Sequence, residues 1–428
     1  MVYGLIGKSL LHSYSKEIHE ALGRYSYELF SLSPGEMEDF VRSRDFAGLN
    51  ITIPYKKDVI PLCDHVTDLA GEIGAVNTLY WENYEGEKRL TGHNTDYEGF
   101  LYAASRAGID FKDKTVLILG TGGTSLMAGK AASRRGAKRI YTASRSGREG
   151  TVSYESLPDL GSSVDILVNA TPVGTFPDNL KKPLSLKDLP GCEAVIDVIY
   201  NPGKTALLLE AEERGIKFSN GLPMLVAQAT AAAGYFLGTP GAFESENERI
   251  IALLEEQMEN IVIIGMPGSG KTTAGRLLSQ KTGRPFFDID REVEREAGIT
   301  VPEIFEREGE EGFRRRESKA AADLGKRHGI IIAAGGGTVL RRENLLALRQ
   351  NGRILHLKRP VESLAMDGRP LSSDREALKE MEKKRLPVYE AAADLEFDNS
   401  RPMSKKQLAE ALLKTLDVSQ PPLGRKRP

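Results

Sequence analysis

The stretch from Gly265 to Thr272 has the residue types and spacing needed to hold a chain of phosphates. It reads G-x-x-x-x-G-K-T, follows the apolar run Ile261–Ile264, and precedes a segment of helical character. In that context backbone N–H groups converge on phosphates at the start of a helix, which predicts a nucleoside triphosphate site. The alternative is a glycine-rich turn with a chance Lys-Thr, which is disfavoured because every fixed position matches.

Each residue of this loop has an expected task. Lys271 would lie along the β- and γ-phosphates, and the Thr272 hydroxyl would ligate Mg²⁺. The residues expected to contact the nucleotide are Gly265, Gly268, Ser269, Gly270, Lys271, Thr272 and Thr273.

A second glycine turn lies in the N-terminal half. The apolar run Thr115–Leu119 is followed by Gly120, Gly122 and Gly123 and then by a helix-like segment. Glycines there would let the backbone approach a pyrophosphate at a helix N-terminus. The spacing is not a strict G-x-G-x-x-G, so a plain strand–helix turn stays open as an alternative.

The next strand pattern indicates which dinucleotide this turn would bind. It ends in Ser144 and Arg145, with Arg148 beyond, and no acidic residue occurs from Lys114 to Arg148. An acid would hold the ribose 2′-OH of NAD, whereas an arginine accommodates the 2′-phosphate of NADP. The pattern therefore favours NADPH. The alternative is that Arg145 is a solvated surface charge.

Length and composition limit the function classes. The chain has 428 residues, 40% hydrophobic and 28% charged, with a formal net charge of −2. This predicts two or three globular domains and no basic field for nucleic acid. The two cysteines form no CxxC pair, and no apolar run reaches the length of a membrane span. We expect a cytoplasmic enzyme of small-molecule substrates; the oligomeric state is not predicted.

Apolar β-branched runs alternate with longer helical patterns through most of the chain. Runs of this kind are typical of strands that are buried on both faces, as in parallel sheets covered by helices. The fold class is therefore α/β. The expected strands are Thr115–Leu119, Arg139–Thr142, Ile166–Val168, Ala194–Val198, Ile261–Ile264, Ile330–Ala333 and Arg353–Leu357.

Five short segments follow the phosphate loop. They are the strand pattern Phe286–Asp290 ending in D-x-D, then Phe313–Glu317, Ala334–Thr338, Gly368–Leu371 and Arg385–Tyr389. Taken singly they are weak signals. By default the run Glu306–Glu317 would be a solvated helix face with paired charges.

Several segments of the N-terminal half together resemble shikimate dehydrogenase, over about residues 2–258. The segments are Gly4–Gly7 with His12–Ser15, Gly48–Lys56, Ala75–Thr78 with Gly92–Asp96, Asp165–Gly174 and Asn220–Gln228. The resemblance implies that Lys56 and Asp96 form the catalytic pair. It also implies a substrate site made by Ser13, Ser15, Thr52, Asn77, Asp96, Tyr200 and Gln228. Such chemistry is physically sensible, because reducing a ketone by hydride builds an alkoxide that needs a cation and a proton nearby.

In their order and spacing, the segments after the phosphate loop resemble shikimate kinase, over about residues 260–399. The resemblance implies that Asp290 binds the substrate hydroxyls and takes a proton, and that Asp288 holds Mg²⁺ through water. Arg314 and Arg385 would grip a carboxylate, and Gly336 would donate its N–H to the acceptor. Arg369 would sit on a mobile lid and neutralise the transferring phosphoryl group, with ATP as donor.

The two resemblances predict one bifunctional enzyme of the shikimate pathway. The expected domains are 1–98 for substrate binding, completed by 221–258, then 99–220 for NADP, 259–402 for the kinase, and 403–428 for a helix and disordered tail. The reactions would be NADPH-dependent reduction of 3-dehydroshikimate and phosphorylation of shikimate by ATP. The alternatives are a quinate-preferring dehydrogenase joined to another small-molecule kinase, a ligand-sensing regulatory protein, and a scaffold with one active half.

Overall fold

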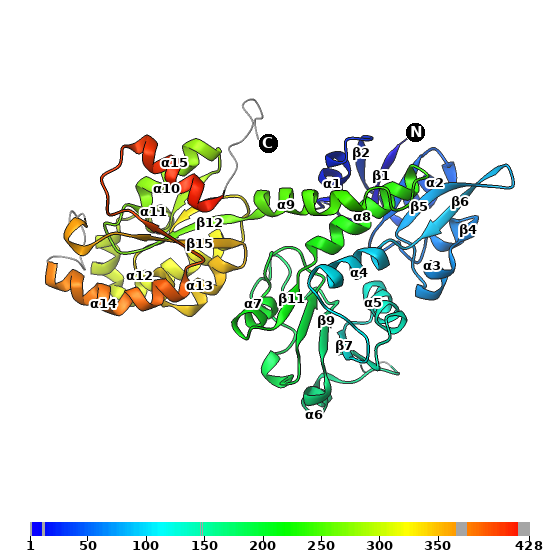
Figure 1. The fold of residues 1–428 in the computed structure, drawn as a ribbon, viewed down its shortest axis with the longest axis horizontal. Helices are drawn as coiled ribbons and strands as arrows, with labels where there is room; N and C mark the ends of the chain where they lie inside the picture. The colour runs from blue at the N-terminus through cyan, green and yellow to red at the C-terminus, as the bar shows by residue number, and fades with distance from the viewer. Residues whose placement is uncertain (1, 11–12, 146, 148, 365–374, 418–428) are drawn as a thin grey trace. The chain divides into compact units, whose positions relative to one another are not determined.

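The computed structural model describes residues 2–10, 13–145, 147, 149–364 and 375–417. The chain divides into two compact units, coloured from blue to green and from green to red in Figure 1. The first holds the residues up to Leu254 apart from 176–180 and 202–204; the second takes those two segments and the chain from Glu255 onward. Among the described residues, no helix combines the length and the apolar character needed to cross a bilayer.

The first sheet of the first unit is mixed. Within the described residues its strand order is β2-β1-β3-β5-β6-β4. The strands are β1 (Tyr3–Gly7), β2 (Tyr27–Ser31), β3 (Gly48–Ile51), β4 (His65–Val66), β5 (Thr78–Tyr84) and β6 (Glu87–His93). The helices are α1 (Ser15–Ala21), α2 (Pro34–Ser43), α3 (Asp68–Ile73) and α4 (Asp96–Arg106). Because β5 runs antiparallel to β3 and β6, its start meets the ends of β3 and β6 at one edge of the sheet.

The second sheet of this unit is parallel, in the order β11-β10-β9-β7-β8 over the residues described. Its strands are β7 (Thr115–Leu119), β8 (Arg139–Ala143), β9 (Ile166–Asn169), β10 (Ala194–Asp197) and β11 (Lys217–Ser219). The helices around it are α5 (Gly123–Arg134), α6 (Leu157–Leu160) and α7 (Ala206–Glu213). Val116 and Ile118 pack in one apolar cluster and Leu117 and Leu119 in another, so both faces are buried. This is why the strand is apolar at consecutive positions.

Two further helices follow the second sheet. α8 (Leu222–Phe236) packs against α4 and α1, and α9 (Asn247–Met258) precedes the third sheet. Alanine is frequent in α8, and small side chains let a helix approach its neighbour closely. At Gly99 of α4, for example, a Cβ would lie 2.5 Å from the Met224 carbonyl oxygen.

The second unit contains a parallel sheet with the order β13-β14-β12-β15-β16 in the part described. Its strands are β12 (Asn260–Ile264), β13 (Phe286–Asp288), β14 (Ile331–Ala333), β15 (Gly352–Lys358) and β16 (Leu395–Asp398). The helices are α10 (Lys271–Thr282), α11 (Ile289–Ala297), α12 (Val301–Gly325), α13 (Arg342–Arg349), α14 (Arg375–Ala392) and α15 (Lys405–Leu416). Alternate residues of β12 again enter two clusters, one with α11 and α12 and the other with α10 and α15.

The predicted fold class is confirmed, and every predicted strand is present, although β8 at the edge of its sheet is only partly buried. The predicted strand through Asp290 is wrong in its last two residues, because β13 ends at Asp288 and Ile289 begins α11. Ile289 is fully buried in the cluster with α12, and a short apolar run does not distinguish a buried strand from the start of a buried helix. Asp290 therefore lies in the first turn of a helix, where the helix dipole favours a carboxylate.

Candidate active sites

A lysine and an aspartate form the centre of the first site. The Lys56 Nζ lies 2.5 Å from Asp96 Oδ2, and the two side chains are 18% and 11% exposed. Lys56 follows β3, and Asp96 is the first residue of α4, after the end of β6. A charge pair with little water around it can hold a proton beside a reacting oxygen.

A buried amide orients this pair. Asn77 Nδ2 donates to Asp96 Oδ1 at 3.0 Å, and Asn77 Oδ1 accepts the Thr95 N–H at 2.7 Å. Asn50 on β3 donates to the Asn77 carbonyl and itself accepts the Tyr27 hydroxyl at 2.7 Å. Asn50 and Tyr27 were not among the predicted site residues. The sequence feature that could have indicated Asn50 is an asparagine within an apolar strand, because a buried amide needs hydrogen-bond partners.

A cavity of about 360 Å³ surrounds the pair. It is lined by every residue predicted for the substrate: Ser13, Ser15, Thr52, Lys56, Asn77, Asp96, Tyr200 and Gln228. Ser13 Oγ donates to Ser15 Oγ at 3.1 Å, so the two hydroxyls act together. The lining is rich in hydroxyl and amide groups, which suits a small polyhydroxylated acid. His93 and Asn94 instead bond to Thr67, Glu98 and the Ala75 carbonyl, and so shape the loop before Asp96.

The second glycine turn lies at the carboxyl end of β7. Gly120 has φ +106°, and a Cβ there would lie 3.1 Å from the Ala170 carbonyl oxygen. Gly122 caps α5 and Gly123 is its first residue, which leaves the N-terminal amides of α5 near the turn. These features fit a pyrophosphate.

The end of β8 carries the residues predicted for the 2′-phosphate. Ser144 is buried and Arg145 is exposed, while Arg148 lies outside the described residues. Burial raises the pKa of Tyr154, and the positive charge of Arg145 opposes that rise. The charge of Arg145 is therefore near the Tyr154 phenol, a neighbour that was not predicted.

The phosphate loop of the second unit has the predicted conformation of a strand–loop–helix turn. Gly265, Gly268 and Gly270 all have positive φ, between +84° and +144°. The Lys271 Nζ donates to the Gly265 and Met266 carbonyls at 2.9 Å, so its side chain lies across the loop. Asn399, which follows β16, donates to the Ser269 carbonyl at 2.9 Å and was not predicted.

A hydroxyl and a carboxylate stand together beside this loop. Thr272 Oγ1 donates to Asp288 Oδ2 at 2.7 Å. In the part of the chain that the structure describes, no group of three or more His, Cys, Asp or Glu could hold a metal. Mg²⁺ in nucleotide sites usually takes only one or two protein oxygens and fills its shell with water and phosphate oxygens, so this pair fits Mg²⁺.

Four charged side chains enclose the glycine loop after β14. A Cβ on Gly335 would lie 2.7 Å from Asp290 Oδ1 and 2.8 Å from Glu317 Oε1. On Gly336 it would lie 3.1 Å from Arg385 Nη1, and on Gly337 2.5 Å from Arg314 Nη1. A cavity of about 470 Å³ holds these groups together with Lys271, Thr272, Thr273, Gly268, Gly270 and Asp288. The predicted Arg369 lies outside the described residues.

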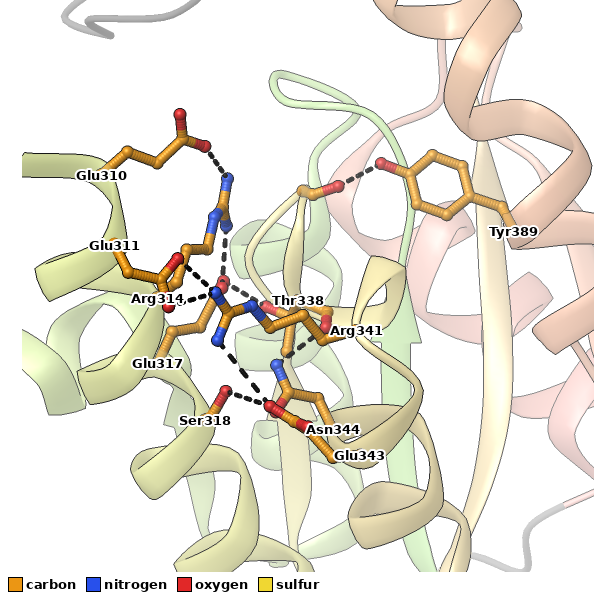
Figure 2. A network of polar contacts seen from close by, with 11 residues as sticks. Glu310, Glu311, Arg314, Glu317, Ser318, Thr338, Arg341, Glu343, Asn344 and Tyr389 are labelled. Atoms are coloured by element: carbon orange, nitrogen blue, oxygen red, sulfur yellow. Dashed lines mark hydrogen bonds and ion pairs between the residues drawn. The ribbon is translucent and has the colours of Figure 1, made fainter.

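Arg314 is held by buried and exposed acids. Figure 2 shows its guanidinium between Glu310 and Glu317, with Nη1 2.7 Å from Glu317 Oε2. Glu317 is 1% exposed, and its other oxygen accepts the Thr338 hydroxyl at 2.6 Å. Burial would lower the pKa of Arg314, but Glu317 and Glu310 outweigh this effect and raise it. The default prediction of a solvated helix face is therefore wrong for Arg314 and Glu317.

A tyrosine reaches the same loop from α14. The Tyr389 hydroxyl donates to the Gly336 carbonyl, on the side of the loop away from Arg314 in Figure 2. Tyr389 is fully buried and lies one helical turn after Arg385. Tyr389 is the last residue of the segment Arg385–Tyr389 in the sequence analysis, but no role was predicted for it.

The direction of α12 changes at Gly309. This residue has φ +70° and ψ −177°, a conformation open almost only to glycine, and the helix resumes toward Arg314. Its sequence neighbours predict one continuous helix. The kink therefore decides where Arg314 and Glu317 point.

We predict that Gly309→Ala lowers the free energy of unfolding of the second unit by about 1–3 kcal/mol, the cost of a strained backbone. Urea unfolding of the full chain, followed by far-UV circular dichroism, measures this. The single tryptophan, Trp81, lies in the first unit, so the midpoint of its fluorescence transition should stay unchanged. An unaltered circular dichroism profile would contradict the prediction.

Comparison with known proteins gives similarities in both units. The family model for the shikimate dehydrogenase substrate binding domain matches residues 5–79, and that for shikimate kinase matches residues 267–417. The shikimate dehydrogenase (NADP(+)) of Caldicellulosiruptor bescii is 38% identical over 252 residues, which cover 53% of this chain and 86% of that protein.

Two solved structures are similar to the first part of the chain. A chorismate mutase/shikimate 5-dehydrogenase fusion protein from Clostridium acetobutylicum is 33% identical with a TM-score of 0.55, covering 60% of this chain and 97% of that one. Shikimate 5-dehydrogenase from Thermus thermophilus, solved in complex with NADP(H) and shikimate, is 31% identical with a TM-score of 0.52. That match covers 59% of this chain and 99% of the other.

Proposed function

Because this chain belongs to the shikimate dehydrogenase family and also carries a shikimate kinase domain, we propose that it performs two successive reactions. The first is the reduction of 3-dehydroshikimate to shikimate with NADPH. The second is the phosphorylation of shikimate at its 3-hydroxyl by ATP. Both activities belong to the shikimate pathway, and the product of one is the substrate of the next.

One observation carries the proposal. Each unit has a cavity in which the predicted residues for the same kind of acid meet: the Lys56–Asp96 pair among hydroxyls and amides in one, and Asp290 with Arg314 and Arg385 in the other. The first cavity suits reduction of a ring ketone and the second suits phosphoryl transfer to a ring hydroxyl. The relative from Thermus thermophilus, whose structure holds NADP(H) and shikimate, supports the same ligands for the first unit.

In the reduction, a hydride reaches the ketone carbon, and the ketone oxygen gains a proton. NADPH would supply the hydride. The Lys56 ammonium would stabilise the negative charge that grows on the oxygen and donate the proton to it, while Asp96, held by Asn77, keeps Lys56 oriented. Solvent then returns a proton to Lys56.

In the phosphorylation, the substrate oxygen forms a bond to the γ-phosphorus, and the bond to the β–γ bridging oxygen breaks. Asp290 would accept the proton of the attacking hydroxyl. Arg314 and Arg385 would bind the carboxylate, and Lys271 would neutralise charge on the phosphates. The role of Arg369 on a lid, and that of Gly336 as a donor, stay part of this proposal.

Two non-protein groups are needed, and residues of this chain fit them. Thr272 and Asp288 would hold Mg²⁺, which would neutralise phosphate charge during transfer. Gly120, Gly122 and Gly123 would receive the pyrophosphate of NADPH, and Ser144 and Arg145 its 2′-phosphate. We also assign residues 1–98 with 221–258 to substrate binding, 99–220 to the dinucleotide and 259–402 to the kinase.

A coupled assay tests the function. With 3-dehydroshikimate, NADPH, ATP and Mg²⁺, we expect loss of NADPH absorbance and formation of shikimate 3-phosphate; without ATP the product should be shikimate.

We predict that Lys56→Ala lowers the dehydrogenase turnover by roughly 10²-fold or more and leaves phosphorylation of added shikimate intact. A Lys56→Ala variant that reduces the ketone at the normal rate would refute the assigned proton donor.

The converse variant separates the second activity. We predict that Lys271→Ala lowers the phosphorylation rate by roughly 10²-fold or more, because the phosphates lose a positioned cation. NADPH oxidation by the same preparation should be unchanged and shows that the first unit is folded. A normal phosphorylation rate would rule out the assignment of the phosphate loop.

Arg145 should decide between the two nicotinamide cofactors. We predict that Arg145→Asp lowers the ratio of kcat/KM for NADPH over NADH by about tenfold or more, since an ion pair with phosphate is replaced by repulsion. Arg139→Asp is the matched control, because this exposed arginine lies at the opposite end of the same strand. The same ratio in both variants and the unaltered enzyme would show that Arg145 does not read the 2′-phosphate.

A further inference from the structure

A fully buried carboxylate lies at the end of β10, outside the catalytic pair. Asp197 is 0% exposed and accepts three hydrogen bonds: from Thr205 Oγ1 at 2.7 Å, Asn169 Nδ2 at 3.0 Å and the Ile199 N–H at 3.1 Å. Asn169 and Thr205 are fully buried as well. Burial raises the pKa of Asp197 to about 6, and the three donors oppose that rise. Three donors directed at its two oxygens fit an ionised carboxylate, which can only accept hydrogen bonds.

An acceptor-only group decides how the neighbouring amide is turned. Asn169 must direct its NH₂ group toward Asp197, which leaves its Oδ1 facing the other way. That oxygen accepts both the Thr171 N–H at 3.1 Å and the Thr171 hydroxyl at 2.7 Å. Thr171 Oγ1 in turn accepts the Val173 N–H at 3.3 Å. One carboxylate thus sets the hydrogen bonds of the loop 169–174.

This loop lies directly against the first glycine of the dinucleotide turn. A Cβ on Gly120 would lie 3.1 Å from the Ala170 carbonyl oxygen and 3.3 Å from Thr171 Cγ2. β9 also pairs with β7, so the loop after β9 and the glycine turn after β7 share one edge of the sheet. A change in the loop would therefore alter the surface offered to the cofactor.

We propose that Asp197 is a positioning residue for NADPH, acting through Asn169 and Thr171 on the loop beside Gly120. This rests on the proposed use of NADPH by the first unit. Asp197 is fully buried and does not line the cavity around Lys56 and Asp96; it holds the amide of Asn169 in the one orientation that fixes Thr171. Asp197 also accepts the Ile199 N–H, in the segment that leads to Tyr200. An asparagine at position 197 would keep this hydrogen bond, because its side-chain oxygen can accept it.

The test is Asp197→Asn, which keeps the shape but removes the charge and turns an NH₂ group toward the Thr205 hydroxyl. Its single oxygen, now neutral, must serve both Asn169 and Ile199, so Asn169 and, through it, Thr171 are held less firmly. We expect the dissociation constant of NADPH, titrated by its fluorescence with the full chain, to rise about tenfold, as when a hydrogen bond to a buried charge becomes one to a neutral oxygen. The KM for shikimate, measured in the oxidation direction at saturating NADP⁺, should change less than about twofold.

Asp165→Asn is the matched control. Asp165 accepts the Thr115 N–H at 2.7 Å, but at the amino end of the same sheet, away from the cofactor. Its NADPH dissociation constant should equal that of the unaltered protein. Equal NADPH affinity of Asp197→Asn and the unaltered protein would overturn the inference, whereas an unaltered protein that does not bind NADPH would refute the proposed function itself.

A second variant keeps the inference testable if Asp197→Asn does not fold. Thr171→Val removes the hydroxyl at the far end of the bridge of hydrogen bonds from Asp197 through Asn169 to Thr171. It leaves the buried carboxylate intact and should also weaken the binding of NADPH. If both variants fold, their combination should weaken binding by less than the product of the single effects, since both break one bridge. Unchanged affinity in Thr171→Val, or fully multiplicative effects in the double variant, would overturn the proposed route.

Discussion

The direction of the strands is the constraint on which both sites depend. In each sheet the polar residues that could do chemistry follow strand ends that meet at one edge. In the first sheet Ser13, Thr52 and Asp96 follow β1, β3 and β6, while Asn77 immediately precedes the antiparallel β5. In the third, the phosphate loop follows β12, Asp288 ends β13, and the glycine loop follows β14. In a parallel sheet the binding crevice lies at the carboxyl ends of the strands. Segments that are distant in the sequence therefore meet there.

These sheet edges carry charged groups that are largely removed from water, and three of these groups have partners that fix their orientation. Asp96 is held by Lys56 and Asn77, Arg314 by Glu317, and Asp197 by Asn169 and Thr205. Taking such groups out of water costs free energy that only well-directed partners offset. Their fixed orientation favours catalysis, because groups that are already oriented need little rearrangement when charge develops on a substrate.

Glycine allows the backbone to come close enough for these contacts. At Gly335 and Gly337 a Cβ would collide with the carboxylates and the guanidinium that define the acceptor cavity. At Gly265 and Gly120 the positive φ and the neighbouring carbonyl groups exclude other residues. The same property serves phosphate loop, dinucleotide turn and acceptor site, although their ligands differ.

Local patterns in the sequence were enough to determine the class of fold and the position of most strands, whereas most candidate site residues were predicted through the resemblance to two families. A phosphate loop is a signal of eight consecutive residues, and a buried strand is a short apolar run, so both can be read without knowing what they touch. The end of β13 was misjudged, because the buried Ile289 fits the apolar pattern of a strand as well as that of the helix that it begins.

What only the tertiary structure decided is which groups hold the site residues in place. Asn77 and Asp96 are 19 residues apart, Asn169 and Asp197 are 28 apart, and Gly336 and Tyr389 are 53 apart. Such contacts depend on strand register and helix packing, which no local pattern encodes. Even Glu317, only three residues from Arg314, was expected to face solvent, because the turn of α12 at Gly309 and the burial against Thr338 appear only in three dimensions.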